Sequence, residues 1–275
     1  MKLRMIRRPT NPASTWLWNH RSNVTSQCGE DGILAKIFEV IGQHGKVCVE
    51  FGAWDGVLYS NTHSLIRQQD WTGYLIEANA EKFKTLQHTY RDNPKAHLVN
   101  RYVQLDKGQG TLDEILAEQN CPREIDLLCI DVDGIDYYIW EGLAAHTAKV
   151  IVIEFNPTVP NDVVFVQERT AKINQGCSLL ALTLLAKERG YELVCANKWN
   201  AIFVRAEYFP LFKIADNSPD AMYQPHLDGR IFHGYDGTIH IVGMPELLWQ
   251  GVPVRAERLQ VLPANLRVFG DAQRS

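Results

Sequence analysis

The chain has 275 residues, of which 45% are hydrophobic and 22% charged, so it can build the buried core of an ordinary globular protein. Its formal net charge of −4 gives no reason to expect a nucleic-acid partner or an anionic membrane surface. The sequence contains no run of 18 apolar residues, so it predicts no membrane span. Prolines follow the basic first residues, where a signal peptide would have an apolar segment.

The cysteines point to a reducing compartment. Six of them occur without a CxxC pair, and Cys48, Cys129 and Cys195 stand inside apolar runs. Reduced cysteines behave in such runs as small hydrophobes. We therefore expect a reduced, cytoplasmic protein.

The hydrophobic pattern divides the chain into three parts. Residues 1–22 form a polar lead-in, residues 23–206 alternate between strand-like and helix-like segments, and residues 207–275 are rich in Pro, His and aromatic residues. In chain order, the pattern predicts helices over residues 33–41, 61–69, 80–90, 111–119, 137–146 and 178–189, and strands over residues 47–51, 73–77, 97–103, 125–131, 149–155, 191–196 and 200–205.

Strands that alternate with helices are typical of a parallel sheet covered on both faces. The last two strands flank the short turn 197–199, which predicts an antiparallel hairpin at the edge of the sheet. The expected fold class is α/β and Rossmann-like: a mostly parallel seven-stranded sheet with an antiparallel terminal hairpin and helices on both faces. We expect residues 207–275 to be a C-terminal extension packed on this core, beside the substrate.

The segment from Val47 to Gly56 is the most informative one. A β-branched run reaches Glu50 and passes into a loop between Gly52 and Gly56, where the lack of a Cβ lets the backbone approach a ligand closely. The next predicted strand ends in Glu77, about 25 residues after the first glycine, and an acid there can accept both hydroxyls of a ribose. This arrangement predicts a nucleoside-binding edge of the sheet.

Five motifs, in this order, resemble those of class I S-adenosylmethionine-dependent methyltransferases, and most closely those of the FkbM-type family. They cover roughly residues 26–205 and are Ser26-Gln27-x-Gly29-Glu30-Asp31-Gly32, Val49-Glu50-Phe51-Gly52-Ala53-x-Asp55-Gly56, Leu75-Ile76-Glu77-Ala78, Ile130-Asp131-Val132-Asp133-Gly134 and Val152-Ile153-Glu154. The resemblance implies an enzyme that transfers the methyl group of S-adenosylmethionine, here to a hydroxyl of a small acceptor.

The resemblance also implies where the cofactor lies. The loop from Gly52 would pass under its methionine and Glu77 would hold its ribose. We expect Gln27, Glu30 and Asp55 at the amino-acid end, with Asn100 and Tyr102 beside the adenine. The complete predicted set is Gln27, Glu30, Glu50, Gly52, Asp55, Gly56, Glu77, Ala78, Asn100, Tyr102 and Asp131. For Glu30 and Asp31, capping of the following helix is an equally open interpretation.

Two neighbouring predicted strands run into oxygen-bearing side chains, which are Asp131, Asp133 and Asp136 after one strand and Glu154 and Asn156 after the other. Converging carboxylates repel one another unless a cation or shared protons hold them, and oxygen ligands suit a hard divalent ion. We predict Mg²⁺ or Mn²⁺ on Asp131, Asp133, Glu154 and Asn156, as in the similar metal-dependent O-methyltransferases. In that interpretation the metal holds the acceptor hydroxyl, lowers its pKa and aims it at the methyl group.

A second interpretation of these acids stays open. Asp131 would touch the substrate, Asp133 and Asp136 would cap the next helix, and Glu154 would pair with an arginine. Gly134 stands where the catechol-type enzymes often have a lysine, so a general base must come from elsewhere. The catalytic candidates are Asp131, Asp133, His226, His233 and His240.

The acceptor is expected to resemble a sugar. A long polar segment over residues 156–176 can cover it, and aromatic residues at 197–199 and 223–235 can stack on its faces. A sugar, a sugar nucleotide or a glycan or natural-product precursor fits this description. Surface packing of the same aromatic residues is equally open, and the sequence is compatible with a homo-oligomer.

Other classes of protein also share parts of the pattern. Asp131-Val132-Asp133-Gly134 matches the DxDG motif of HAD-type phosphatases, and Asp131-Val132-Asp133 could bind the metal of a nucleotide-sugar glycosyltransferase. A catalytically silent binding module with the methyltransferase fold is a further alternative. An NAD oxidoreductase is disfavoured because Gly52-x-x-x-Gly56 lacks the GxGxxG spacing.

Overall fold

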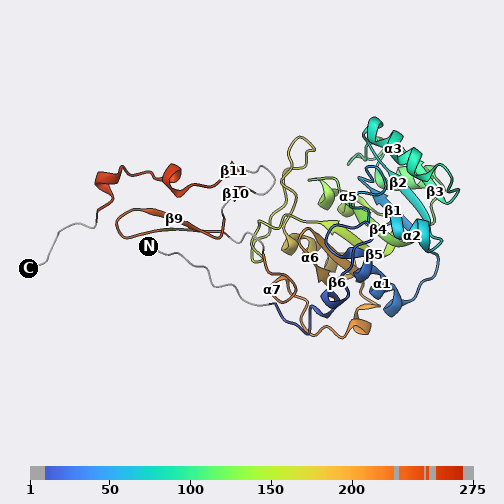
Figure 1. The fold of residues 1–275 in the computed structure, drawn as a ribbon, viewed down its shortest axis with the longest axis horizontal. Helices are drawn as coiled ribbons and strands as arrows, with labels where there is room; N and C mark the ends of the chain where they lie inside the picture. The colour runs from blue at the N-terminus through green and yellow to red at the C-terminus, as the bar shows by residue number, and fades with distance from the viewer. Residues whose placement is uncertain (1–9, 226–228, 245, 248–251, 269–275) are drawn as a thin grey trace, which may run out of the picture.

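The computed structural model describes residues 10–225, 229–244, 246–247 and 252–268. Its centre is a seven-stranded sheet in the order β3-β2-β1-β4-β5-β7-β6 (Figure 1). Strands β1 to β5 are parallel, whereas β7 is antiparallel to β5 and to β6. The strands are β1 (Val47–Phe51), β2 (Thr72–Ile76), β3 (Ala96–Val99), β4 (Glu124–Ile130), β5 (Thr147–Glu154), β6 (Tyr191–Ala196) and β7 (Asn200–Arg205). The predicted sheet and its terminal hairpin are confirmed.

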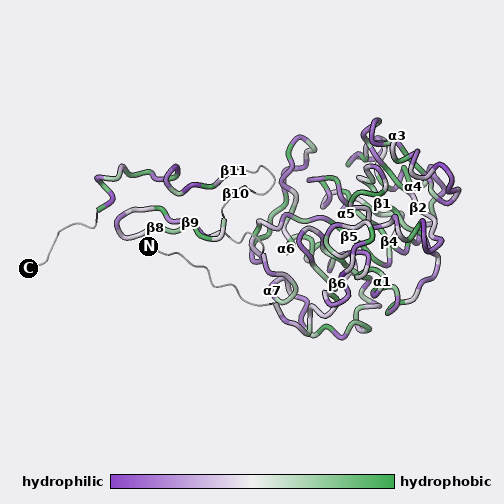
Figure 2. The backbone as a smooth tube through the Cα atoms, in the orientation of Figure 1, coloured by the Kyte–Doolittle hydropathy of each residue, from purple (hydrophilic) through white to green (hydrophobic). Residues whose placement is uncertain are grey.

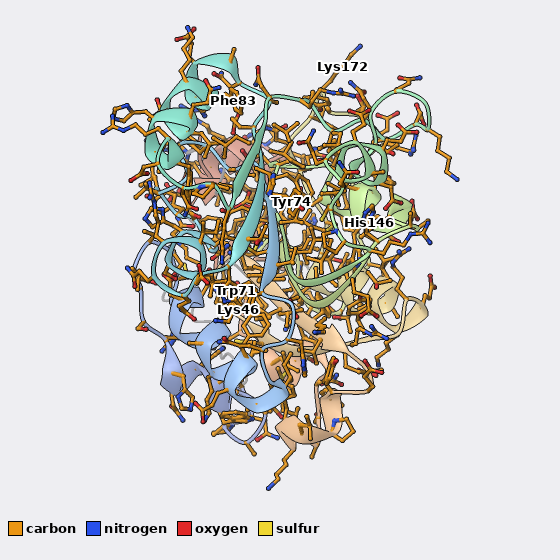
Figure 3. All side chains as sticks on the ribbon, turned by 90° about the vertical axis from the view of Figure 1, so that its right-hand side faces the viewer. Lys46, Trp71, Tyr74, Phe83, His146 and Lys172 are labelled. Carbon is orange, nitrogen blue, oxygen red and sulfur yellow. The ribbon has the colours of Figure 1, made fainter. Side chains whose placement is uncertain are left out.

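Helices cover both faces of this sheet. Figure 3 looks onto its β3 edge, and Phe83 of α3 lies on one side of Tyr74 in β2 while His146, just after α5, lies on the other. The helices are α1 (Glu30–Ile41), α2 (His63–Gln68), α3 (Ala80–Tyr90), α4 (Leu112–Glu118), α5 (Asp136–Gly142), α6 (Leu179–Glu188) and α7 (Pro219–Met222). None of the helices in the described part of the chain has the length and apolar character needed to span a bilayer.

Burial and capping explain why these elements form. All of β1 is buried, as is β4 after Glu124, so their near-continuous apolar runs suit the middle of a parallel sheet. The hydrophobic stretches gather in the rounded body of the protein (Figure 2). Asn79 caps α3 by accepting hydrogen bonds from two backbone N–H groups, and Thr111 forms a capping box with Glu114 at α4.

Two elements end earlier than the sequence predicts. Strand β3 stops at Val99, and the residues up to 110 form a loop that borders the cavity described below. Helix α5 stops at Gly142 because the carboxylate of Asp113 accepts the backbone N–H groups of Ala144 and Ala145. These N–H groups are therefore not available for the backbone hydrogen bonds that a longer α5 would need.

The two ends of the chain also differ from expectation. The polar lead-in packs on the core through η1 (Trp16–His20), where Leu17 is fully buried and the indole of Trp18 donates to the carbonyl of Ala196. Beyond η2 (Phe209–Phe212) and α7, the described residues 229–244, 246–247 and 252–268 form an arm that lies apart from the sheet (Figure 1). Of the extension predicted over residues 207–275, the described part up to Tyr223 contributes to the hydrophobic core, and the packing of the extension beside the acceptor stays a prediction.

The arm is built from hairpins. It consists of β8 (Arg230–His233), β9 (Ile239–Val242), β10 (Glu246–Leu247), β11 (Val252–Pro253), η3 (Ala256–Leu259) and η4 (Ala264–Leu266). Strands β8 and β9 pair with each other, and β10 pairs with β11. Among the described residues, these strands therefore pair within the arm and not with the central sheet.

Candidate active site

A cavity of about 490 Å³ opens where β1, β2, β4 and β5 reach their carboxyl ends. Its volume lies within the range of small-molecule sites, about 300–1,000 Å³. Parallel strands open their carboxyl ends on one edge, so residues far apart in the sequence meet there. The predicted residues that line it are Gln27, Glu50, Gly52, Glu77, Ala78, Tyr102, Asp131, Asp133 and Glu154.

At Gly52 the loop after β1 meets the carboxyl end of β4. Its φ of 75° lies in the left-handed region, and a Cβ placed on it would come within 1.8 Å of the carbonyl oxygen of Asp131. Only glycine avoids both the strained φ and this collision. The loop after β1 can therefore lie directly against the end of β4.

Glu77 anchors the loop after β1 from the neighbouring strand. Only 7% of this residue is exposed, and its carboxylate accepts the backbone N–H groups of Trp54 at 2.8 Å and Asn79 at 2.6 Å. Asn100 lies behind it and donates to the carbonyls of Glu77 and Ala78, so it supports the wall without lining the cavity. Each carboxylate oxygen of Glu77 keeps a second lone pair for a ligand.

Trp54 and Lys82 form a cation–π pair at the mouth of the cavity. The Lys82 Nζ lies 3.0 Å from the centroid of the Trp54 ring, and both residues line the cavity. Trp54 has a φ of 50°, which is uncommon for a bulky residue and is held here by the hydrogen bond to Glu77. Sequence reasoning missed this pair because the two residues stand on different elements.

Glu50 is a buried acid at the floor of the cavity. One carboxylate oxygen accepts the hydroxyls of Ser60 at 2.6 Å and Thr62 at 2.7 Å, and the other accepts the backbone N–H of Asn61 at 2.7 Å. Burial raises the pKa of Glu50, and these hydrogen bonds oppose part of that rise. Ser60 and Asn61 also line the cavity, and the sequence analysis did not identify them.

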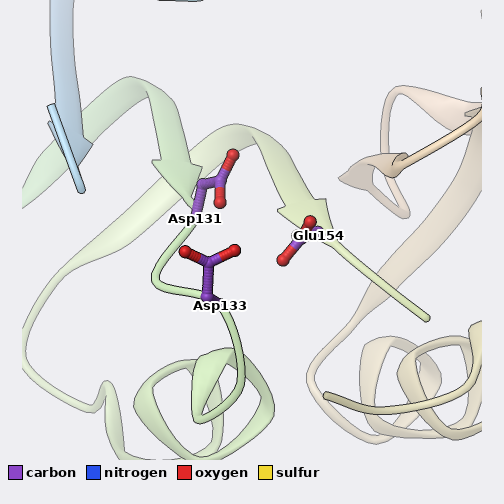
Figure 4. A group of neighbouring side chains, drawn as sticks. All are labelled: Asp131, Asp133 and Glu154. Atoms are coloured by element: carbon purple, nitrogen blue, oxygen red, sulfur yellow. The ribbon is translucent and has the colours of Figure 1, made fainter. Parts of the chain in front are cut away.

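Three acids converge on the opposite side. Asp131 and Asp133 follow β4 and Glu154 ends β5, and one carboxylate oxygen of each lies within 4.8 Å of those of the other two (Figure 4). Asp131 is exposed and Glu154 half-buried, but the protein atoms around both limit their hydration and raise the pKa of each well above the ordinary value, and repulsion between the acids adds to the rise. Such a group is held together by shared protons or by a cation.

Asp136 shapes the loop that carries two of these acids. It is 2% exposed, and its carboxylate accepts the backbone N–H groups of Val132 at 2.9 Å and Gly134 at 2.8 Å. Asp133 between them has a φ of 58°, as expected in a tight turn. Asp136 therefore holds the turn before α5, whereas the second interpretation expected it to cap the helix, whose N-cap residue is Ile135.

Besides Asn100, four residues of the predicted cofactor and metal sets lie outside the cavity lining. Glu30 is fully buried and accepts hydrogen bonds from the side-chain amides of Asn197 and Asn200, which ties α1 to the β6–β7 hairpin. Asp55 accepts the backbone N–H groups of residues 57 and 58 within its own loop. Gly56 packs on α3, and the amide of Asn156 bonds within the segment 156–176.

The predicted histidines are not brought to the cavity. His233 belongs to β8, and His240 belongs to β9 and packs against Phe232 with ring centroids 5.1 Å apart. Neither lines the cavity, because both stand on the arm. His226 lies outside the described residues.

Comparison with known proteins gives distant likenesses. No family model matches the chain, and no curated protein matches it in sequence. It is similar to the N-terminal domain of EvdMO1 with SAH bound, at 12% identity and a TM-score of 0.42 over 64% of this chain and 80% of that one. It is also similar to SAM-dependent methyltransferases from Aquifex aeolicus (12% identity, TM-score 0.41, 64% and 88% covered) and Clostridium acetobutylicum (11%, 0.41, 64% and 90%).

Proposed function

We propose that this protein transfers the methyl group of S-adenosylmethionine to a hydroxyl of a small, sugar-like acceptor with the help of a divalent cation. The observation that carries the proposal is one cavity with two chemically different ends. Gly52 and Glu77 form one end, and Asp131, Asp133 and Glu154 form the other. A nucleoside-containing donor and a hydroxylated acceptor can therefore meet in it.

The donor end suits the nucleoside of the cofactor. Glu77 offers free lone pairs at the tip of β2, where ribose hydroxyls can donate to them. Ile135 at the N-cap of α5, Ile139 of α5 and Val103 of the loop after β3 line the same cavity, which gives an adenine ring apolar surfaces. Tyr102 adds an aromatic ring at this wall.

The acceptor end fits a hard cation by its donor set. All three acids offer carboxylate oxygens, and the groups that shift the pKa of Asp131 and Glu154 are all acids. Among the described residues, Glu154 forms no ion pair with an arginine, as the second interpretation required. We propose Asp131, Asp133 and Glu154 as the ligands of the cation. Asn156 was also predicted as a ligand, but we do not include it because its side-chain amide already forms hydrogen bonds within the protein.

Different residues of the chain would have different roles in the reaction. When bound, the cofactor supplies an electrophilic methyl group and the cation supplies charge that lowers the pKa of the acceptor hydroxyl. Gly52 and Glu77 orient the donor, and the acids orient the hydroxyl oxygen for in-line attack. As the acceptor oxygen gains the methyl group that the cofactor's sulfur loses, a carboxylate oxygen of Asp133 would receive the hydroxyl proton.

Aromatic side chains support a sugar-like acceptor. Tyr59 and Trp199 line the cavity together with Gln27, which offers both a donor and an acceptor. Rings beside hydrogen-bonding groups are suited to the apolar faces and the hydroxyls of a sugar. The acceptor is therefore proposed as a hydroxylated small molecule of the sugar or sugar-nucleotide class.

Calorimetric titration with S-adenosylhomocysteine and a methyl-transfer assay over a panel of sugars and sugar nucleotides test the proposal. We expect the cofactor product to bind, chelation to abolish transfer, and Mg²⁺ or Mn²⁺ to restore it. Asp131→Asn should abolish transfer and leave the binding of S-adenosylhomocysteine within about threefold, since less than 1 kcal/mol is then lost. Full transfer in excess chelator would reject the cation, and no cofactor binding with turnover of a phosphomonoester would favour the phosphatase.

A further inference from the structure

Two cationic side chains near the tip of the β6–β7 hairpin have no acidic partner. Lys198 belongs to the turn between β6 and β7, Arg21 directly follows η1, and both residues are exposed. No carboxylate in the described part of the chain forms an ion pair with either of them, although the whole chain has a net charge of −4. Such a local excess of positive charge attracts an anionic ligand.

The ammonium of Lys198 is held against the wall of the cavity. Its Nζ lies 4.6 Å from the centroid of the Trp199 ring, and Trp199 lines the cavity. The carbonyl of Trp199 accepts the backbone N–H of Phe155, which directly follows Glu154. The hairpin tip therefore stands beside the acid that ends β5, at the end of the cavity proposed for the acceptor.

The buried carboxylate of Glu30 joins the two segments that carry these cations. It accepts hydrogen bonds from the side-chain amides of Asn197 at 2.6 Å and Asn200 at 2.9 Å, and from the backbone N–H of Cys28 at 2.6 Å. Gln27, which precedes Cys28, lines the cavity. The segment before α1 is therefore fixed against the hairpin tip at the rim of the cavity.

The half-buried thiol of Cys28 lies close to both cations. Burial, and after it Glu30, raise the pKa of this thiol, and the charges of Lys198 and Arg21 offset part of that rise. Arg21 is held in place because its Nε donates to the carbonyl of Trp18 at 3.0 Å. Two cations near one another repel, and an anion bound between them removes that repulsion.

We propose that the acceptor carries a phosphate group, which Lys198 and Arg21 bind at the rim while the sugar lies in the cavity; this rests on the proposed function. Ammonium and guanidinium N–H groups form charge-assisted hydrogen bonds to phosphate oxygens, and a guanidinium can bind two of these oxygens at once. The ring of Trp199 lies between this rim and the acid end of the cavity. The acceptor is thereby narrowed to a sugar phosphate or a sugar nucleotide.

Calorimetric titration with inorganic pyrophosphate tests the two cations directly. EDTA is present, so that no divalent ion on the three acids contributes to binding. We expect the wild type to bind pyrophosphate, and the double variant Lys198→Gln/Arg21→Gln to bind it about 5- to 20-fold more weakly. Lys84→Gln is the matched control, because Lys84 pairs with Glu81 on the surface of α3, and it should bind like the wild type. If pyrophosphate does not bind, or binds the double variant equally well, the inference is wrong.

A second variant separates charge from folding. Lys198→Arg keeps the positive charge at the hairpin tip and should bind pyrophosphate within about twofold of the wild type, whereas Lys198→Gln alone should bind it more weakly. This comparison replaces the double variant if that protein does not fold. Equal binding by the arginine and glutamine variants would overturn the inference.

Methyl transfer to matched acceptors tests the same cations in the reaction. The panel contains neutral sugars, their 1-phosphates and the corresponding sugar nucleotides, so it also shows which phosphorylated form is used. We expect transfer to phosphorylated members, with a KM about 5- to 20-fold higher in the double variant and kcat within about twofold. Equal kcat/KM for neutral sugars would overturn the inference and spare the proposed function. A protein that binds pyrophosphate through these cations but does not bind S-adenosylhomocysteine would overturn the proposed function and leave an anion site.

Discussion

Glu77 has two tasks that one carboxylate can combine. It holds the backbone of Trp54 and Asn79, and it faces the cavity with lone pairs to spare. The loop after β1 is thus fixed by the same side chain that we propose for the ribose. Cofactor affinity and the order of this loop are expected to depend on one residue.

Glu77→Gln tests this dual use. The amide replaces one acceptor oxygen by an NH₂ group, which cannot accept from a backbone N–H or from a ribose hydroxyl. We expect S-adenosylhomocysteine to bind about 10- to 100-fold more weakly in calorimetry. Glu81→Gln is the control, because Glu81 pairs only with Lys84 at the surface. A loss of the same size in the control would show that overall charge, not the site, controls binding.

Gly52→Ala examines the contact between the two halves of the cavity. The new methyl group would meet the Asp131 carbonyl and the φ of 75° would be strained, so we expect a loss of roughly 1–3 kcal/mol or more in the free energy of unfolding. Gly142→Ala is the matched control, because nothing lies within 4 Å of its added Cβ. It should be neutral or stabilise α5 by up to about 1 kcal/mol. Denaturant unfolding that ranks the two variants equally would contradict this account.

Most helices and strands could be predicted from the sequence. The strands were predicted well because apolar runs such as Val47–Phe51 carry their own signal. The end of α5 was missed because it depends on Asp113 of α4, a contact that no local pattern contains. Trp54 and Asn61 were missed for the same reason, since the conformation of the loop after β1 brings them to the cavity, and Lys82 was missed because only the position of α3 puts it beside Trp54.

The turn after β4 gives a prediction at the scale of the element. Asp136 holds this turn through two backbone N–H groups, and an asparagine has only one oxygen to accept them. Asp136→Asn should displace Asp131 and Asp133, so we expect methyl transfer to fall at least tenfold while S-adenosylhomocysteine binds within about threefold of the wild type. Asp136 would act as a positioning residue. An equal loss in affinity and turnover would assign it to general folding instead.

At the scale of the whole molecule, Asp113 and His146 link α4 to the turn before β5. The carboxylate of Asp113 lies 2.8 Å from Nδ1 of the buried His146 and accepts three backbone N–H groups. Burial alone would raise the pKa of Asp113, but the hydrogen bonds from His146 and the backbone outweigh it and lower the pKa from 3.8 to about 2. The folded state therefore prefers the ionised form.

This shift makes the stability of the protein sensitive to acid. A lowered pKa contributes stability that is complete above the unfolded value near 3.8 and is lost as the pH falls toward 2. Asp113→Asn should be less stable than the wild type at pH 6, and the gap should narrow between pH 4 and pH 2. Urea unfolding at a series of pH values measures it. A gap that stays constant with pH would show that the charge is not involved.

The separate position of the arm has a consequence for how this protein can change. Among the described residues, those that line the cavity lie between Gln27 and Trp199, and the arm follows η2 and α7 in the chain. We therefore expect substitutions, insertions or a proteolytic cut among the described residues of the arm to leave the lining of the cavity unchanged. The arm is free to diverge under its own selection while the fold that carries the cavity stays fixed.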